Sequence, residues 1–293
     1  MKYKNVILIT GASIGLGLAT AKLLLKHNYF LVLSARESSI HRFAEHSIFE
    51  SETVWVRELD VTNSKERKKL IEEINDKKGG VDVLINNAGV AYRSVVEHVT
   101  EHERIEQLNI NFFSVMELTR LVLPSMRTKR SGKIINISSV SGMMAMPTMS
   151  IYSASKFALE GASESLWYEV RPWNINVCLI QPGFIHSNSF RKTHSTFLGQ
   201  DALADPDNPY HAHYSNMQGF IQKMMNKTTC TPEKVARIIY KTINRKNPPL
   251  RIPGTFDAYL FYLLRRLCPR NLYHKLLYKS LPHINKWGKK PSA

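Results

Sequence analysis

The sequence predicts an α/β fold with a doubly wound parallel sheet, helices on both of its faces and a helical extension at the C-terminus. Two observations predict it. Short apolar runs, typical of strands that are buried on both faces, recur through the first 182 residues. Stretches with helical periodicity separate these runs, and repeated strand–helix–strand units with right-handed crossovers build such a sheet.

The predicted elements alternate in order along the chain. Strands are expected at 5–10, 29–35, 53–59, 81–87, 132–138 and 174–182. Helices are expected at 17–27, 63–78, 103–129, 150–171 and 231–245. The organisation that follows is a single cofactor-binding and catalytic domain over 1–253, and a basic amphipathic extension over 254–293. Residues 183–229 are rich in His, Asn, Ser and Met without clean periodicity, which predicts a mobile flap over the substrate.

Composition restricts the class of protein. The chain has 293 residues, of which 43% are hydrophobic, as expected for a globular domain with a full core. Its three cysteines are widely separated and form no CxxC, so we predict no metal site, no disulfide framework and a reducing compartment. No apolar run approaches about 20 residues, and the N-terminus shows no signal segment, so a cytoplasmic protein without a transmembrane span is expected.

The formal net charge of +16 is concentrated near the C-terminus. From Arg245 onward there are eleven Lys and Arg residues and one acidic residue, Asp257. The stretch 259–277 adds apolar helical faces to this charge. Three alternatives stay open: helices that pack over the substrate cleft or a second subunit, a peripheral contact with the cytoplasmic face of a membrane, or, least favoured, nucleic acid.

The first predicted strand ends in TGASIGLG (10–17), with glycines at 11, 15 and 17. Glycine at a strand-to-helix turn lets the backbone approach a pyrophosphate, whose charge is stabilised by the helix N-terminus. The spacing is Gly-x3-Gly-x-Gly, not the commoner Gly-x-Gly-x2-Gly. Its position between the first strand and the first helix predicts a dinucleotide site.

A tyrosine and a lysine stand four residues apart in IYSASKFALE (151–160). On a helix these positions share one face, so Tyr152 and Lys156 point the same way. A phenol titrates at about 10, and a nearby ammonium favours the phenolate and lowers that value. The pair therefore predicts proton transfer by Tyr152.

Five motifs occur in order: TGASIGLG, NNAG (86–89), NISSVSG (136–142), the Tyr152/Lys156 pair and the PG at 182–183. Together, over roughly residues 5–190, they resemble the short-chain dehydrogenase/reductase family. The stretch YSASKFALEGASESL is similar to its hydroxysteroid and retinol dehydrogenase branch. The resemblance implies a Rossmann fold, a nicotinamide cofactor and a homo-oligomer built on the helices at 103–129 and 150–171.

The resemblance also implies roles for single residues. Ser139 matches the serine that hydrogen-bonds the reacting oxygen, with Ser138 as its competitor. Asn111 matches the asparagine that holds a water in the proton relay, with Asn109 as its competitor, and Lys156 holds the nicotinamide ribose. The full set predicted as catalytic is Asn111, Ser139, Tyr152 and Lys156.

The second predicted strand decides between the two nicotinamide cofactors. An NAD-selective site has an Asp at its end, whereas this chain has Ala35 followed by Arg36, which can pair with a 2′-phosphate. NADP(H) is therefore predicted. The cofactor-binding residues that the sequence predicts are Gly11, Ser13, Ile14, Gly15, Gly17, Arg36, Asp60, Val61, Asn87, Ala88, Gly89, Tyr152, Lys156, Pro182, Gly183, Ile185 and Ser187.

The sequence thus predicts an NADP(H)-dependent oxidoreductase that interconverts a carbonyl and an alcohol. The Met-rich segment SGMMAMP (141–147) and the C-terminal extension favour an apolar, lipid- or steroid-like substrate. Two alternatives stay open. One is a ketoacyl-carrier reductase, whose basic surface receives an acidic carrier. The other is a non-catalytic NADP(H) sensor with the same fold.

Overall fold

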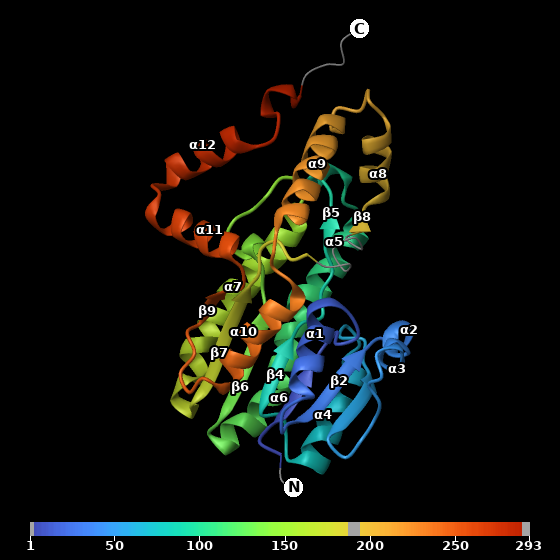
Figure 1. Cartoon of the computed structure of the whole chain (residues 1–293), viewed down its shortest axis with the longest axis vertical. Coiled ribbons are helices and arrows are strands. Elements are labelled where there is room, and N and C mark those ends of the chain that lie inside the picture. The colour runs from blue at the N-terminus through green and yellow to red at the C-terminus, as the bar shows by residue number, and fades with distance from the viewer. Residues whose placement is uncertain (1–2, 187–193, 289–293) are drawn as a thin grey trace.

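The computed structural model describes residues 3–186 and 194–288. Within them lies a seven-stranded sheet in the order β3-β2-β1-β4-β6-β7-β9, in which every neighbouring pair is parallel (Figure 1). Its strands are β1 (Val6–Ile9), β2 (Phe30–Ala35), β3 (Val54–Glu58), β4 (Val83–Asn86), β6 (Gly132–Ile137), β7 (Ile175–Gln181) and β9 (Arg251–Pro253). The predicted fold class is confirmed, and β9 adds an edge strand to the six that were predicted.

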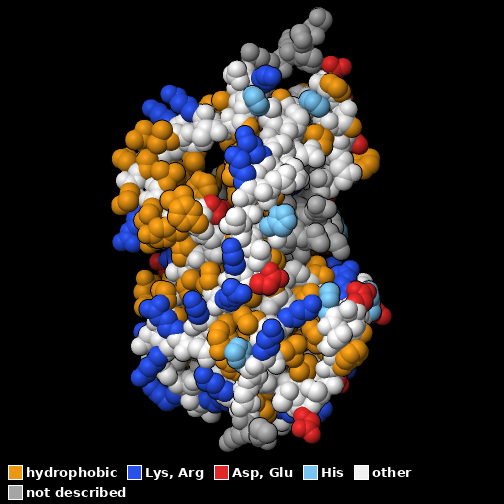
Figure 2. Space-filling view, viewed as in Figure 1, with side chains coloured by type: hydrophobic (Ala, Val, Ile, Leu, Met, Phe, Trp, Pro, Cys, Tyr) orange, Lys and Arg blue, Asp and Glu red, His pale blue; other side chains and the backbone are white. Residues whose placement is uncertain are grey.

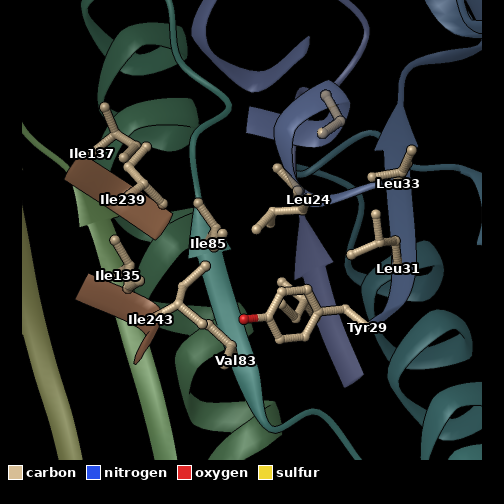
Figure 3. Packing of buried hydrophobic residues seen from close by; sticks show 14 of the residues in the cluster. Leu24, Tyr29, Leu31, Leu33, Val83, Ile85, Ile135, Ile137, Ile239 and Ile243 are labelled. Atoms are coloured by element: carbon tan, nitrogen blue, oxygen red, sulfur yellow. The ribbon is translucent and has the colours of Figure 1, made fainter. Parts of the chain in front are cut away.

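Helices cover both faces of the sheet. On one face lie α1 (Gly15–Leu24) and α10 (Pro232–Asn244), and on the other α4 (Ser64–Lys78), α6 (Ser114–Lys129) and α7 (Ser150–Val170). Figure 3 shows Ile239 and Ile243 of α10 packed beside Ile135 of β6 and Val83 of β4. A strand with apolar side chains on both faces needs helices on both faces of its sheet to cover them. The apolar runs of the sequence therefore agree with the helices observed on the two faces.

The segment at 183–229 differs from its prediction. It contains two helices, α8 (Phe197–Ala204) and α9 (His211–Lys227), and the short strand β8 (His194–Ser195), which pairs with β5 (Tyr92–Arg93). The buried face of α9 consists of Tyr214, Met217, Ile221 and Met225. This face has helical spacing, but Met and Tyr among many His, Asn and Gln residues obscured it.

The helix predicted at 103–129 is interrupted. It consists of α5 (Glu101–Leu108), a π-helical turn at Asn109–Phe113 and α6. Short π-helical turns inside α-helices occur frequently at functional sites. This turn places Asn111 in the interior of the protein, where it is 1% exposed.

The C-terminal extension forms α11 (Phe256–Leu267) and α12 (Arg270–Ser280), which extend away from the sheet (Figure 1). After α12 the chain returns to α9, where Leu281 and Trp287 pack against the cluster around Met217. Within the described ranges, no helix combines the length and the apolar character needed to cross a bilayer. Of the remaining short helices, α2 (Glu37–Ile40) and α3 (Arg42–Glu45) follow β2.

Candidate active site and cofactor cleft

The turn between β1 and α1 is shaped for an anion. Gly11 and Gly15 have positive φ angles of 62° and 55°, which favour glycine. A Cβ on Gly17 would lie 2.3 Å from the carbonyl oxygen of Gly11. The N-cap residue Ile14 makes no side-chain cap hydrogen bond, and no acidic residue lies in the first turn of α1. Backbone N–H groups at the start of α1 therefore suit a pyrophosphate.

Asn87 fixes this turn against the end of β4. Its Nδ2 donates to the carbonyl oxygens of Thr10 and Gly11, each at 2.9 Å. In return, Thr10 Oγ1 accepts from the backbone N–H groups of Asn87 and Ala88, each at 3.0 Å. The NNAG motif thus joins β1 to β4, where the strand order reverses and open α/β sheets bind their ligands.

A cavity of about 960 Å³ opens at this edge of the sheet. Ten of the residues predicted for the site line it: Ile14, Arg36, Asn87, Gly89, Ser139, Tyr152, Lys156, Pro182, Gly183 and Ile185. The others that the structure describes do not line it: Gly11, Ser13, Gly15, Gly17, Asp60, Val61, Ala88 and Asn111. Ser187 lies outside the described residues.

Tyr152 and Ser139 meet inside this cavity. The Ser139 hydroxyl faces the Tyr152 phenol closely enough to act on its pKa, and Ser139 Oγ accepts from the N–H of Ser141 at 3.1 Å. Ser138 Oγ makes no hydrogen bond within the described chain, so Ser139, not Ser138, is the partner of Tyr152. Ser139 is the second residue after β6, and Tyr152 lies in the first turn of α7.

The electrostatics of Tyr152 differ from the prediction. Burial raises the pKa of the Tyr152 phenol, while the hydrogen bond from Ser139 and the charge of Arg93 act in the opposite direction. The expected lowering of its pKa by Lys156 is not found in the protein alone. Desolvation disfavours the phenolate and outweighs both opposing effects. Tyr152 therefore holds its proton at neutral pH.

Lys156 lies in the interior at 6% exposure, with its Nζ 5.8 Å from the centre of the Tyr152 ring. The ammonium donates to the carbonyl oxygen of Ile137 at 2.9 Å. Burial lowers the pKa of Lys156 to about 8, and the carboxylate of Glu160 one turn later acts against this. The lysine is thus held between β6 and the tyrosine.

Asn111 connects the NNAG loop to α7. Its Oδ1 accepts from the N–H of Val90 at 2.9 Å, and its Nδ2 donates to Val90 O at 2.8 Å and to Ser155 Oγ at 3.1 Å. Asn109 is only half-buried, so the buried residue of the pair is Asn111. Its side chain holds the loop beside Gly89 in place, and its role with water stays a prediction.

Asp60 and Val61 lie outside the cavity lining. Asp60 Oδ1 accepts from the N–H and the hydroxyl of Thr62, at 2.8 and 2.7 Å. The backbone carbonyl of Val61 accepts from the guanidinium of Arg67. Asp60 and Val61 therefore accept hydrogen bonds from residues that follow them closely in the chain. Their contact with an adenine stays a prediction.

Residues after β2 line one wall of the cavity. Arg36 lies there as predicted, together with Ser38, Ser39 and Arg42. The second arginine was not identified from the sequence, because α2 turns the chain back and brings Arg42 to the same wall. A signal was present: two arginines and two serines within seven residues of a strand end suit a phosphate.

Another part of the cavity lining is apolar. Met146, Met149, Met217 and Ile221 line it, from the loop before α7 and from α9. On the buried face of α9, a cluster is formed by Met217, Ile221 and Met225, and Phe184 and Met146 pack against it. Flexible, polarisable side chains of this kind accept apolar ligands of varied shape.

The C-terminal extension is attached to the cavity wall. Thr255 Oγ1 accepts from the N–H of Gly183 at 2.8 Å, and Asp257 Oδ2 accepts from the N–H of Phe184 at 3.0 Å. Gly183 and Phe184 both line the cavity. The single acidic residue of the basic extension therefore holds the PG loop.

Comparisons with known proteins agree with this geometry. Residues 5–196 match the family model described as short chain dehydrogenase. The chain is 38% identical over 270 residues to a 3-ketodihydrosphingosine reductase of Bacteroides thetaiotaomicron, covering 92% of this chain and 94% of that protein.

Solved structures share the fold. A short-chain dehydrogenase from Streptomyces avermitilis superimposes with a TM-score of 0.78 at 29% identity, covering 94% of this chain and 99% of that one. One from Burkholderia phymatum, in complex with NAD, gives 0.72 at 22% identity over 99% and 98% of the two chains. The matching family model and the Bacteroides relative show that the chain belongs to the short-chain dehydrogenase/reductase family of oxidoreductases.

Proposed function

We propose that the protein is an NADP(H)-dependent oxidoreductase that interconverts a carbonyl and an alcohol on an apolar substrate. The observation that carries the proposal is that Ser139, Tyr152 and Lys156 line one cavity, in which the Tyr152 phenol is desolvated. These three groups stand beside a glycine turn that suits a pyrophosphate. A desolvated phenol beside a serine hydroxyl in one cavity is an arrangement that suits proton transfer to a carbonyl oxygen.

Each residue of the site has one task. Bound NADP(H) supplies or accepts the hydride. Tyr152, protonated because burial raises its pKa, gives its proton to the carbonyl oxygen during reduction. Ser139 would donate a hydrogen bond to the same oxygen, and Lys156 would hold the nicotinamide ribose and stabilise the phenolate that remains. Asn111 keeps the loop at Gly89 in place.

The substitution Tyr152→Phe tests this mechanism. We expect reduction of ketones to fall by at least about 100-fold, the usual contribution of a general acid, while NADPH still binds. The matched control is Tyr168→Phe on the same helix, because Tyr168 is 63% exposed. Turnover by the Tyr152 variant at the wild-type rate, measured as NADPH oxidation at 340 nm, contradicts the mechanism.

The preference for NADP(H) rests on Arg36 and Arg42. The fold does not decide the cofactor, but two guanidiniums on one wall of the cavity favour a 2′-phosphate. We expect Arg36→Met with Arg42→Met to weaken NADPH binding about 10- to 100-fold and to leave NADH binding within about twofold. Equal losses for both cofactors, or stronger wild-type binding of NADH, contradict the assignment.

The apolar, lipid-like substrate is supported by the methionines that line the cavity and by the name of the Bacteroides relative. The rival function is reduction of ketoacyl groups on a carrier protein. Turnover of the same ketoacyl group free and carrier-linked separates the two. A strong preference for the carrier-linked form favours the rival.

We also propose that the extension contacts an anionic membrane surface. The C-terminal surface consists of exposed apolar side chains of α11 and α12, and Figure 2 shows hydrophobic groups gathered over this arm with Lys and Arg at its edges. Its members are Phe256, Tyr259, Leu260, Leu267, Leu272, Leu276 and Tyr278. Exposed cations at 265, 266, 275 and 279 lie on the same two helices, which complements anionic headgroups.

Sedimentation with phosphatidylcholine vesicles, with and without phosphatidylserine, tests the membrane contact. We expect binding only to the anionic vesicles and its loss in Leu260→Glu/Leu267→Glu. Phe49→Glu is the control, since Phe49 is also exposed, at 64%, but lies far from the extension in the chain. Absence of wild-type binding refutes the contact.

A homo-oligomer built on α6 and α7 is proposed as well. The exposed side chains of Phe113, just before α6, and Phe157 on α7 support it, because exposed apolar groups are suited to burial against a second copy. Light scattering should give a multiple of 33.6 kDa, reduced by Phe157→Glu. A monomer at all accessible concentrations contradicts this proposal.

A further inference from the structure

A second cavity, of about 400 Å³, lies apart from the cofactor cleft. It forms where α11 lies against β9 and against the 3₁₀ turn at Val140–Gly142. In the described part of the chain no residue lines both cavities: Val140 and Ser141 line the first, whereas Gly142 lines the second. This second cavity is called the α11 pocket below.

The carboxylate that lines the α11 pocket, Glu160, is already paired. Arg251 Nε donates to Glu160 Oε2 at 2.9 Å, and its Nη2 donates to Glu164 Oε2 at 2.6 Å. Glu160 Oε1 accepts from Gln181 Nε2 at 3.0 Å. Two carboxylates thus share one guanidinium, which gives this group of side chains a net charge of −1.

Two more guanidiniums, those of Arg265 and Arg266, line the pocket from α11. Arg266 Nη1 donates to Tyr262 OH at 2.8 Å, and the guanidinium of Arg265 lies 5.1 Å from the centre of the Tyr273 ring. Both of these partners are neutral, and no salt bridge among the described residues includes either arginine. The two arginines bring the total charge at the pocket to +1. Guanidiniums pair strongly with phosphate and carboxylate groups.

Other parts of the lining also suit a ligand. Gln181 is 1% exposed, and its Oε1 makes no hydrogen bond within the described chain. A buried acceptor without a donor is costly, so a donor on a ligand stabilises it. Met143 and Phe157 add apolar surface. A Cβ on Gly161 would meet nothing within 4 Å, so there is open space at this wall of the pocket.

We propose that the α11 pocket binds a single-chain anionic amphiphile that carries a phosphate and a hydroxyl group. Arg265 and Arg266 bind the phosphate, Gln181 Oε1 accepts from the hydroxyl, and the alkyl chain packs against Met143 and Phe157. This binding does not depend on the proposed reaction. The same chemistry comes from two sources, a free amphiphile or a lipid in a bilayer surface.

Calorimetric titration of the full-length protein with 1-dodecanoylglycerol 3-phosphate, below its micelle-forming concentration, tests the site. We expect one molecule to bind per chain. The variant Arg265→Met/Arg266→Met should weaken binding about 10- to 100-fold, the effect of losing charge-assisted hydrogen bonds. Gly161→Leu should abolish binding, because its side chain occupies the open space of the pocket. Its melting temperature shows whether it folds.

Matched controls separate this pocket from other cationic surfaces. Arg36→Met/Arg42→Met in the cofactor cleft and Lys275→Met/Lys279→Met on α12 should leave binding within about twofold of the wild type. Inorganic phosphate and dodecyltrimethylammonium should not bind at the same concentrations, because the first lacks the chain and the second has the wrong charge. Light scattering of each variant distinguishes a change in assembly from a change in the pocket.

Vesicles that contain phosphatidic acid separate the two sources. If Gly161→Leu lowers sedimentation with these vesicles, the pocket takes a lipid from the bilayer. If sedimentation is unchanged while binding of the free amphiphile is lost, the pocket takes the free molecule. Neither measurement uses NADPH or a ketone, so failure of the proposed reaction leaves this inference standing.

Three results overturn the inference. The first is that the wild type does not bind the amphiphile. The second is unchanged binding in both the Arg265→Met/Arg266→Met variant and a folded Gly161→Leu variant. The third is loss of binding in Arg36→Met/Arg42→Met alone, which would place the amphiphile in the cofactor cleft.

Discussion

The attachment of α11 to the PG loop predicts that a residue of the extension controls the catalytic domain. Asp257 Oδ2 accepts from the N–H of Phe184 at 3.0 Å. The packing there is so close that a Cβ on Gly183 would lie 1.9 Å from the same oxygen. A change at either Asp257 or Gly183 therefore displaces the other.

In Asp257→Ala the N–H of Phe184 loses a charged acceptor. Such a loss lowers the free energy of unfolding by about 1–3 kcal/mol, which corresponds to a decrease in Tm of about 2–10 °C. Because Gly183 and Phe184 line the cavity, Asp257→Ala should also raise KM for NADPH. The exposed Asp76 on α4 provides the control, and Asp76→Ala should cost less than about 0.5 kcal/mol.

A double-mutant cycle measures the contact directly. Gly183→Ala should be strongly destabilising in the wild type, because the new methyl group meets the Asp257 carboxylate. It should cost markedly less when Asp257 is already alanine. Urea unfolding of the four proteins gives the interaction free energy. If Gly183→Ala costs the same in both backgrounds, the attachment described here is wrong.

Three further predictions follow from single contacts. Gly17→Ala should abolish NADPH binding, measured by fluorescence, because the new Cβ would lie 2.3 Å from the backbone oxygen of Gly11. The control Gly161→Ala has open space around it in α7 and should stabilise the protein by about 0.5–1 kcal/mol. Burial lowers the pKa of Lys156 from 10.5 to about 8, so between about pH 8 and 10.5 the lysine is neutral in the folded protein and charged in the unfolded chain. The contribution of Lys156 to the free energy of unfolding therefore rises over that range. NADPH affinity should fall over the same range, and Lys156→Arg should remove this fall. Lys133→Met should lower the free energy of unfolding by at least about 2 kcal/mol in urea, because Lys133 Nζ donates to three carbonyl oxygens at the end of α10, at 2.6–2.9 Å.

Local features of the chain were sufficient to predict the layers of the fold and to place the candidate site residues on their elements. Strand patterns, glycine spacing and an i, i+4 pair are properties of neighbouring residues, and each acts through short-range backbone geometry. For that reason the glycine turn and Tyr152 with Lys156 could be placed on their elements in advance. The helix α9 was missed, since its apolar face uses methionine and tyrosine in a polar stretch.

The sequence by itself determined where the candidate groups lie on the strands and helices, and the tertiary structure decided the environment of each group. The pKa of Tyr152 shows the difference: a lysine four residues away predicts a lower value, but burial in the folded protein raises it. Burial, and contacts such as Asp257 with Phe184, depend on residues far apart in the chain. The field at a buried group is the sum over everything packed around it, so only the folded chain brings Arg93 to bear on Tyr152.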